Sequence, residues 1–174
     1  MTEYVIRLLR SDEAPAYRDA LIDLLVDAVE GGASVNFVWP MTREKSARWW
    51  DRALGDIATG ERRIFVAERN GGVDGTVQLI LAPQENQPHR ADIAKMLVHR
   101  RARRQGLGKA LLDAAESHAR EIGRTLLTLD TESGSDGERF YARMGWIKFG
   151  EVPSYARHAD DPVPVPASFF YKVL

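Results

Sequence analysis

The sequence predicts an α/β (α+β) domain in which helices pack on a mixed sheet, and three observations support this. The chain has 174 residues, 44% of them hydrophobic and 28% charged, the size and composition of one globular domain. Apolar segments of period two alternate along it with amphipathic segments of helical period. Turns rich in glycine or proline separate these segments, so we expect a single domain over residues 1–174, with about seven strands and about four helices.

The N-terminal half is predicted to supply three strands and two helices. Ser11 and Thr42 are suitable N-cap residues, while Gly31-Gly32 and Gly60 are suited to end the two helices. Asn70-Gly71 is a strong signal for a two-residue hairpin loop. We therefore expect strands at residues 4–9, 63–68 and 73–81, with helices at 11–31 and 42–60.

The C-terminal half is predicted to supply four strands and two helices. Ser135 and Glu138 have the spacing of a capping box, which marks the start of a short helix that ends at Gly145. Three prolines between Asp160 and Pro166 predict a stiff, extended loop. We expect strands at residues 91–98, 125–130, 146–152 and 167–173 and a longer helix at 105–122.

Charge and composition exclude several classes of function. The chain has 24 basic and 25 acidic residues and a formal net charge of -1, which argues against a dedicated binder of nucleic acid or membrane surfaces. It has no cysteine, and its four histidines lack the spacing of metal ligands, so we expect no disulfide, thiolate nucleophile or metal. No apolar stretch has the length of a signal peptide core or a membrane span, so a cytoplasmic protein is expected.

The most informative segment runs from the strand at residues 91–98 into an amphipathic helix. Arg103, Gly106 and Gly108 open that helix, where backbone amides have no intrahelical partner and the helix dipole is positive. Glycine allows close approach of the backbone, and Arg103 and Arg104 add donors suited to phosphate oxygens. The segment therefore predicts a binding site for a diphosphate.

Three other interpretations are associated with segments of similar sequence. A P-loop requires glycine where Arg103 stands and Ser or Thr where Ala110 stands. A dinucleotide fingerprint favours a small residue where Leu111 stands, although Asp130 follows at the distance of a ribose-binding acid. The third interpretation is a solvated basic loop at residues 99–104, with nucleic-acid contact as a minor version.

Two motifs give the chain a family resemblance. Met96-Leu97-Val98, followed by Arg103-Arg104-Gln105-Gly106-Leu107-Gly108, resembles the acetyl-CoA signature of the GNAT N-acetyltransferases. Residues 140–146, Phe-Tyr-Ala-Arg-Met-Gly-Trp, resemble their second motif. The resemblance implies the GNAT fold, with a mostly antiparallel sheet, and acetyl-CoA as co-substrate. It implies that the pantetheine arm pairs with Met96, Leu97 and Val98, and that the diphosphate lies over Arg103, Arg104, Gln105, Gly106, Leu107, Gly108 and Lys109.

Acetyl transfer to an amine requires a base for the ammonium and a proton donor for the departing thiolate. The resemblance points to Tyr141 as the donor, with Phe140 beside it in the core. Asp130 and Asp92 are the candidate bases, because both fall on central strands where an unpaired charge is costly. Alternatively, each aspartate is held by loop backbone or by an ion pair with Arg90, Lys95 or Arg124.

A narrower resemblance concerns the acceptor. Residues 31–35, 129–135 and 150–155 resemble members of the family that acetylate an amino-acid-like β-lactam toxin. It implies that Ser34, Asn36 and Tyr155 line the pocket of a small primary amine and that the acetyl group passes directly, without an acyl-enzyme. A homodimer through exposed strand edges is a further expectation. The rival interpretation is a non-catalytic CoA-binding or interaction module.

Overall fold

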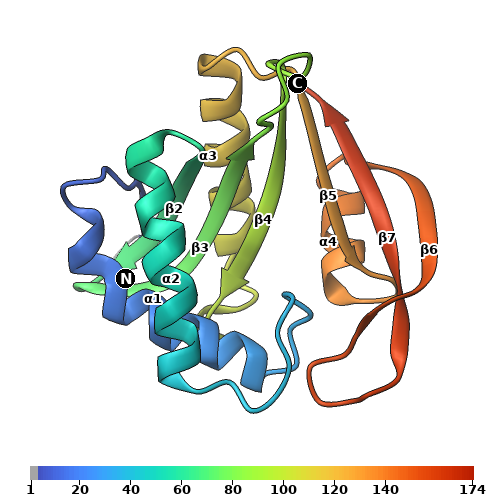
Figure 1. Cartoon of the computed structure of the whole chain (residues 1–174), viewed down its shortest axis with the longest axis horizontal. Helices are drawn as coiled ribbons and strands as arrows, with labels where there is room; N and C mark the ends of the chain where they lie inside the picture. Colours follow the sequence, from blue (N-terminus) through green and yellow to red (C-terminus); the bar gives the residue numbers. More distant parts are fainter. Residues whose placement is uncertain (1–3) are drawn as a thin grey trace.

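The computed structural model describes residues 4–174 and contains one mixed sheet with helices on both faces (Figure 1). The strand order is β1-β2-β3-β4-β5-β7-β6, and the β4–β5 pair is the parallel one. The strands are β1 (Val5–Leu8), β2 (Arg62–Arg69), β3 (Gly72–Leu81), β4 (Arg90–Val98), β5 (Leu126–Glu132), β6 (Ile147–Arg157) and β7 (Pro164–Val173). The helices are α1 (Ala14–Glu30), α2 (Arg43–Thr59), α3 (Leu107–Glu121) and α4 (Asp136–Arg143), with a 3-10 turn at Arg100–Ala102.

This arrangement confirms the predicted fold class and order of elements, and several local signals act as expected. Thr42 accepts a hydrogen bond from the Lys45 amide at the start of α2, and Gly60 ends that helix in the left-handed conformation. Asn70 and Gly71 both have positive φ in the β2–β3 hairpin, as a two-residue loop requires. Local sequence chemistry therefore determines these boundaries.

Three boundaries differ from the prediction. Ser11 does not cap α1: Glu13 occupies the N-cap position, and Pro15 stands in the first helical turn, where a missing N–H has no cost. The β6–β7 hairpin is also longer than expected, reaching Arg157 and Pro164, so the proline segment is partly strand. Before Ala167, strand β7 pairs with β6 but has no β5 partner, so it is an edge strand there, where proline is tolerated.

Two apolar clusters hold the layers together. One lies between the sheet and α3 and α4, and includes Leu111, Leu127 and Phe170. The other lies between β1–β4 and the pair α1 and α2, and is built around Leu25, Trp50 and Leu97. Among residues 4–174, no helix has the length and apolar character needed to cross a membrane.

The sheet separates between β4 and β5, and this separation positions the site. The two strands pair only at Arg90–Asp92 and Leu126–Thr128, after which they diverge (Figure 1). Strand β4 stays paired with β3 as far as Val98, through an irregularity opposite Thr76 and Gln78. The backbone of β4 beyond Asp92 therefore presents an edge that β5 does not cover.

Candidate active site

The uncovered edge of β4 leads directly into the basic turn at Arg100–Ala102, which two carboxylates hold in place. Asp27 at the end of α1 accepts hydrogen bonds from the Arg100 amide (3.0 Å) and Nε (2.7 Å). Asp74 on β3 accepts from Tyr4 Oη (2.8 Å) and Arg101 Nε (2.6 Å). Although burial opposes ionisation, these bonds hold the pKa of both aspartates below the usual range.

The next two arginines are not neutralised in this way. Within residues 4–174, neither Arg103 nor Arg104 has a carboxylate partner, although Arg103 Nε donates to the Val98 carbonyl at 3.2 Å. Arg104 and Gly106 have φ of 60° and 81°, so the chain turns sharply before α3. Gly106 is the N-cap of α3 and provides no side-chain cap, which leaves the first helical amides for another acceptor. This combination fits a diphosphate.

The remaining residues expected to hold the co-substrate divide into two groups. Leu97 and Leu107 are buried, each 2% exposed, so only their backbones can contact it. Lys109 is paired with Asp113, and Gln105 donates to the Arg101 carbonyl. The half-buried and exposed positions are Met96, Val98, Arg103, Arg104, Gln105, Gly106, Gly108 and Lys109.

The two candidate bases lie on the same side of neighbouring strands but in different surroundings. Asp92 accepts hydrogen bonds from Arg90 (2.6 Å) and from the Thr128 hydroxyl, so the predicted alternative of an ion pair with Arg90 is present. Asp130 has no side-chain hydrogen bond or salt bridge within residues 4–174. Burial and the nearby charge of Asp92 raise the pKa of Asp130, while Lys95 lowers it. Of the two aspartates, Asp130 is therefore the one whose carboxylate has no side-chain partner among the described residues.

Tyr141 is the more buried member of its aromatic pair, and Phe140 packs, partly buried, against the same apolar core, as expected. Tyr141 is 7% exposed and its ring packs against Phe140, Trp146 and Phe170. Phe140 is half-buried and faces Gly108. Burial, then the charge of Asp130, raises the pKa of the Tyr141 hydroxyl. The hydroxyl therefore stays protonated at neutral pH and is electrostatically coupled to Asp130.

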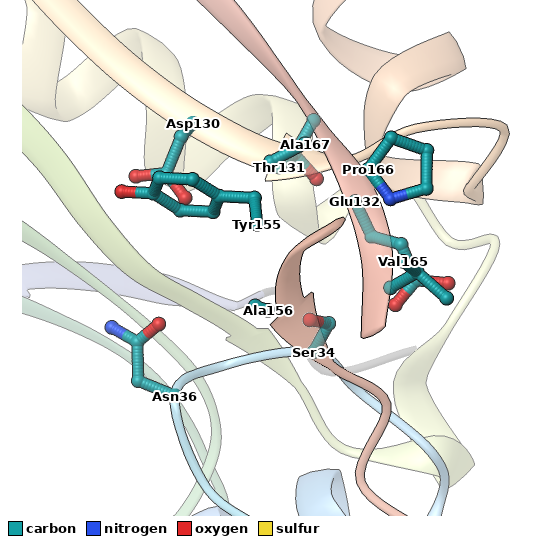
Figure 2. A pocket seen from close by; sticks show the side chains of 10 residues that line it. All are labelled: Ser34, Asn36, Asp130, Thr131, Glu132, Tyr155, Ala156, Val165, Pro166 and Ala167. Atoms are coloured by element: carbon teal, nitrogen blue, oxygen red, sulfur yellow. The ribbon is translucent and has the colours of Figure 1, made fainter. Parts of the chain in front are cut away.

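The three residues expected at the acceptor pocket come together with Asp130 at one recess (Figure 2). Ser34 and Asn36 belong to the loop between α1 and α2, Tyr155 to β6 and Asp130 to β5. The recess itself is narrow, with about 20 Å³ of free space. Asp130 also lines a neighbouring cavity of about 400 Å³, together with Asp92, Thr128, Phe149 and Phe169. Asp130 is the acid shared by the two spaces.

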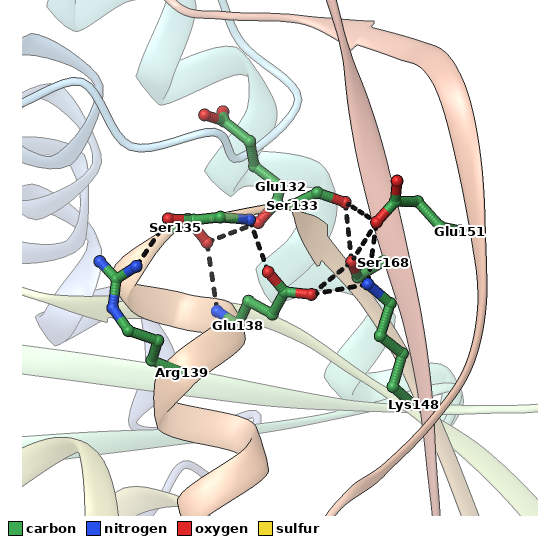
Figure 3. A network of polar contacts seen from close by, with 9 residues as sticks. Glu132, Ser133, Ser135, Glu138, Arg139, Lys148, Glu151 and Ser168 are labelled. Carbon is green, nitrogen blue, oxygen red and sulfur yellow. Dashed lines mark hydrogen bonds and ion pairs between the residues drawn. The ribbon is translucent and has the colours of Figure 1, made fainter.

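A polar network fixes helix α4, which carries Tyr141 (Figure 3). Ser135 accepts from the Glu138 amide at 3.1 Å, the predicted cap, but the Glu138 carboxylate turns elsewhere. It accepts from the buried Ser168 hydroxyl (2.6 Å) and from Lys148 (2.9 Å), and also from the Gly134 amide. The Ser168, Gly134 and Lys148 bonds lower the pKa of Glu138 to about 2.

Lys95 is a further residue at this site that sequence reasoning considered only as an ion-pair partner. It has a φ of 47° at the irregularity of β4. Its ammonium lies 5.3 Å from the centre of the Trp49 ring and 5.7 Å from that of Phe37. The available signal was a lysine inside the otherwise apolar run Ala94–Val98.

Two features of the structure lie together where β4 and β5 separate. One is the anion cradle, which consists of Arg103, Arg104 and the N-terminal amides of α3; the other is the recess lined by Asp130. In residues 4–174, no group of three or more metal-ligating side chains is found. Residues 18–146 match the model of the acetyltransferase (GNAT) family. The chain belongs to this family.

Individual relatives agree with this assignment. An uncharacterised N-acetyltransferase from the hisH-hisA intergenic region of Azospirillum brasilense is 35% identical over 112 residues, 63% of this chain; the match spans 65% of that relative's length. The ribosomal-protein-alanine N-acetyltransferase of Brucella melitensis has a TM-score of 0.75 at 24% identity, covering 98% of this chain and 99% of that one. The yncA protein of Salmonella typhimurium, solved with its cofactor acetyl-CoA, has a TM-score of 0.76 at 17% identity, covering 98% and 94%. The last two likenesses show the fold.

Proposed function

We propose that the protein transfers the acetyl group of acetyl-CoA to the primary amine of a small molecule by direct attack. The observation that carries this proposal is the placement of the two sites. The cradle at Arg103–Gly108 begins where the uncovered edge of β4 ends, and Asp130 faces the gap from the other strand. A pantetheine arm is an extended, amide-containing chain, and it can pair with such an edge as an added strand.

Asp130 is proposed to assist removal of the proton from the acceptor. An ammonium with a pKa of ~10 is only about 0.1% free amine at pH 7, so a base raises the reactive fraction. Asp130 has no competing side-chain partner among the described residues, whereas Asp92 is held by Arg90 and Thr128. Asp92 is therefore assigned to orienting the site, and Asp130 to holding the ammonium or accepting its proton.

Tyr141 is proposed as the proton donor for the departing thiolate. Its raised pKa keeps the hydroxyl protonated, and α4 is held rigidly by the network at Glu138 and Ser168. A donor must be positioned before the reaction to be effective. The proposal includes no acyl-enzyme, because the amine itself attacks the thioester carbon. The CoA thiolate then leaves and takes the proton that Tyr141 donates.

The resemblance of residues 31–35, 129–135 and 150–155 to family members that acetylate an amino-acid-like β-lactam toxin supports an amino-acid-like acceptor. Ser34, Asn36 and Tyr155, the residues that the resemblance implies, line one recess with Asp130.

We also propose a homodimer, since β6 is an edge strand with Phe149 61% and Ile147 52% exposed. Sedimentation of the wild type and of Phe149→Lys tests the dimer: it predicts a loss of mass in the variant, and a monomeric wild type contradicts it.

Thiol release from acetyl-CoA, followed with a panel of primary amines, tests the proposed function. We expect amine-dependent release together with a product that has gained one acetyl group. Binding of CoA without thiol release for any amine supports the rival non-catalytic module. Release that is independent of amine would instead indicate hydrolysis.

A further inference from the structure

Three cations gather around two aromatic rings beside the proposed acceptor site. Lys45 of α2 lies 5.8 Å from the centre of the Phe37 ring, and Arg62 of β2 lies 5.9 Å from that of Trp49. Lys95 of β4 is close to both rings, at 5.7 and 5.3 Å. Cations at such distances are attracted to the ring faces, but the rings do not neutralise their charge.

Polar partners account for two of these cations and not for the third. Lys45 donates to the Val38 carbonyl at 2.9 Å. Arg62 pairs with Asp56 at 3.0 Å and donates to Gln78 Oε1. Lys95 has neither a hydrogen bond nor a carboxylate within 4.0 Å among residues 4–174. A half-buried ammonium without a partner is unusual, because charges are normally paired when water is removed.

A second observation at the same place points to a missing acceptor. Gln78 is completely buried, and its Nε2 has no hydrogen-bond acceptor among the described residues. Its Oε1 is occupied by Arg62, so the free atom is a donor. Gln78 pairs with Ala94, the residue before Lys95. The region around Lys95, Arg62 and Gln78 therefore has more positive charge and more hydrogen-bond donors than the described residues balance.

The irregularity in β4 explains how Lys95 reaches this region. Between the pairs Gln78–Ala94 and Thr76–Leu97, β4 has one residue more than β3. The extra residue reverses the alternation, so that Leu97 enters the α1–α2 core and Lys95 faces Phe37 and Trp49. Burial and the charge of Arg62 lower the pKa of Lys95 to about 8, opposed by Asp130.

We propose that Lys95 binds a carboxylate carried by the acceptor, so that the acceptors are amino acids rather than simple amines. The inference rests on the proposed function and adds the residue that would recognise the acid group of an amino-acid acceptor. Phe37 follows Asn36, which lines the recess with Asp130, and the charges of Lys95 and Asp130 interact. Lys95 itself lines neither of the two spaces at Asp130; in this proposal it holds the acid group of the acceptor, while Asp130 holds the ammonium.

Paired acceptors test this assignment. Initial rates of thiol release are measured for the L-amino acids and for the carboxamide of each, with wild type, Lys95→Met and the matched control Lys45→Met. The ratio of kcat/KM for acid to that for amide is expected to fall about 10-fold to 100-fold in Lys95→Met, the size of one charge-assisted hydrogen bond. It should stay within roughly twofold of wild type in Lys45→Met, because that lysine already has a backbone partner.

An unchanged ratio in Lys95→Met overturns the inference. So does turnover of amines without a carboxylate when every amino acid is unreactive, and that result leaves the proposed function intact. If no amine releases thiol, the proposed function is contradicted, and a binding measurement decides the role of Lys95.

That measurement titrates the L-amino acids into the CoA-saturated protein by calorimetry at pH 8, in two buffers of different ionisation enthalpy. A carboxylate that binds Lys95 raises its pKa, so binding should take up about half a proton per site in wild type and none in Lys95→Met. The charged groups that face Lys95 are Lys45 from α2, Arg62 from β2 and Asp130 from β5. Equal proton uptake in the two proteins, or no binding of any amino acid, overturns the inference.

Discussion

Tyr141 and Asp130 illustrate how burial assigns chemical roles to single residues. Tyr141 is buried, whereas Asp130 is an exposed position of β5 whose carboxylate is only partly desolvated; this desolvation favours the neutral form of each. For tyrosine this preserves the proton that a donor needs. For aspartate it raises the pH above which the residue is a base.

Tyr141→Phe should lower kcat by roughly 100-fold or more while leaving the Kd for CoA within about twofold of wild type. The ring keeps its contacts with Trp146 and Phe170, so we expect the variant to fold. Steady-state kinetics and calorimetry with CoA measure the two quantities. An unaltered kcat would remove Tyr141 from the mechanism.

Asp130→Asn should abolish the acidic limb of the pH dependence of kcat/KM. In the wild type the rate falls as pH drops through the pKa of Asp130, which is raised, because the carboxyl then becomes protonated and stops acting as a base. The asparagine cannot titrate, so its residual rate should lack that limb. Asp92→Asn is the matched control, and a profile moved by Asp92→Asn alone would exchange the two roles.

At the scale of elements, the four arginines of the basic turn fall into two pairs with different roles, which their sequence alone did not distinguish. Arg100 and Arg101 are structural, since Asp27 and Asp74 hold them. Arg103 and Arg104 follow in the same run and have no carboxylate partner among the described residues. The interpretation of this run as a solvated basic loop is therefore wrong for Arg100 and Arg101, while the exposed Arg103 and Arg104 are the pair on which the proposed diphosphate site depends.

Changing both Arg103 and Arg104 to Gln should raise the Kd for CoA by at least about 10-fold, because charge-assisted contacts to phosphate are lost. The salt dependence of CoA binding should become weaker as well. The exposed Arg48 and Arg52 of α2, both changed to Gln, are the control for net charge. Equal Kd values for the two double variants would contradict the cradle.

The network at α4 makes a prediction about stability and pH. The pKa of Glu138 is lowered from 4.5 to about 2, chiefly by Ser168, so its contribution to stability is present above pH ~4.5 and lost as pH falls toward 2. Glu138→Gln should flatten the dependence of the unfolding midpoint in urea between these pH values. Glu85→Gln, at an exposed loop position, should leave it unchanged; equal slopes in both variants would contradict the role of Glu138.

For the whole molecule, the sequence predicted the order of the elements because that order depends on local signals. Thr42, Gly60 and Asn70-Gly71 act through their own backbone neighbours, and such chemistry can be read from a short window. The proline-containing end of β7 was missed because cross-strand pairing with the end of β6 overrides the local preference.

Local sequence patterns indicated only the basic turn of the candidate site and not its acceptor recess. Ser34, Asn36 and Tyr155 lie far apart in the sequence yet line one recess, and a resemblance, not a pattern, indicated them. Lys95 could not have been assigned, since its orientation depends on a one-residue irregularity between β3 and β4. Likewise, the deeper burial of Tyr141 relative to Phe140 depends on tertiary packing against Trp146 and Phe170.

Thermal unfolding with CoA, acetyl-CoA, NAD and ATP, each at 100-fold excess over its Kd or at the highest soluble concentration, tests the central claim most directly. A ligand that binds only the folded state adds ~2.7 kcal/mol under these conditions, a rise of several degrees in Tm for a chain of this size. We predict this rise for CoA and acetyl-CoA, and its loss when Arg103 and Arg104 are both replaced by Gln. No rise with CoA or acetyl-CoA, or a rise with NAD of the same size, would contradict the assignment of the cradle.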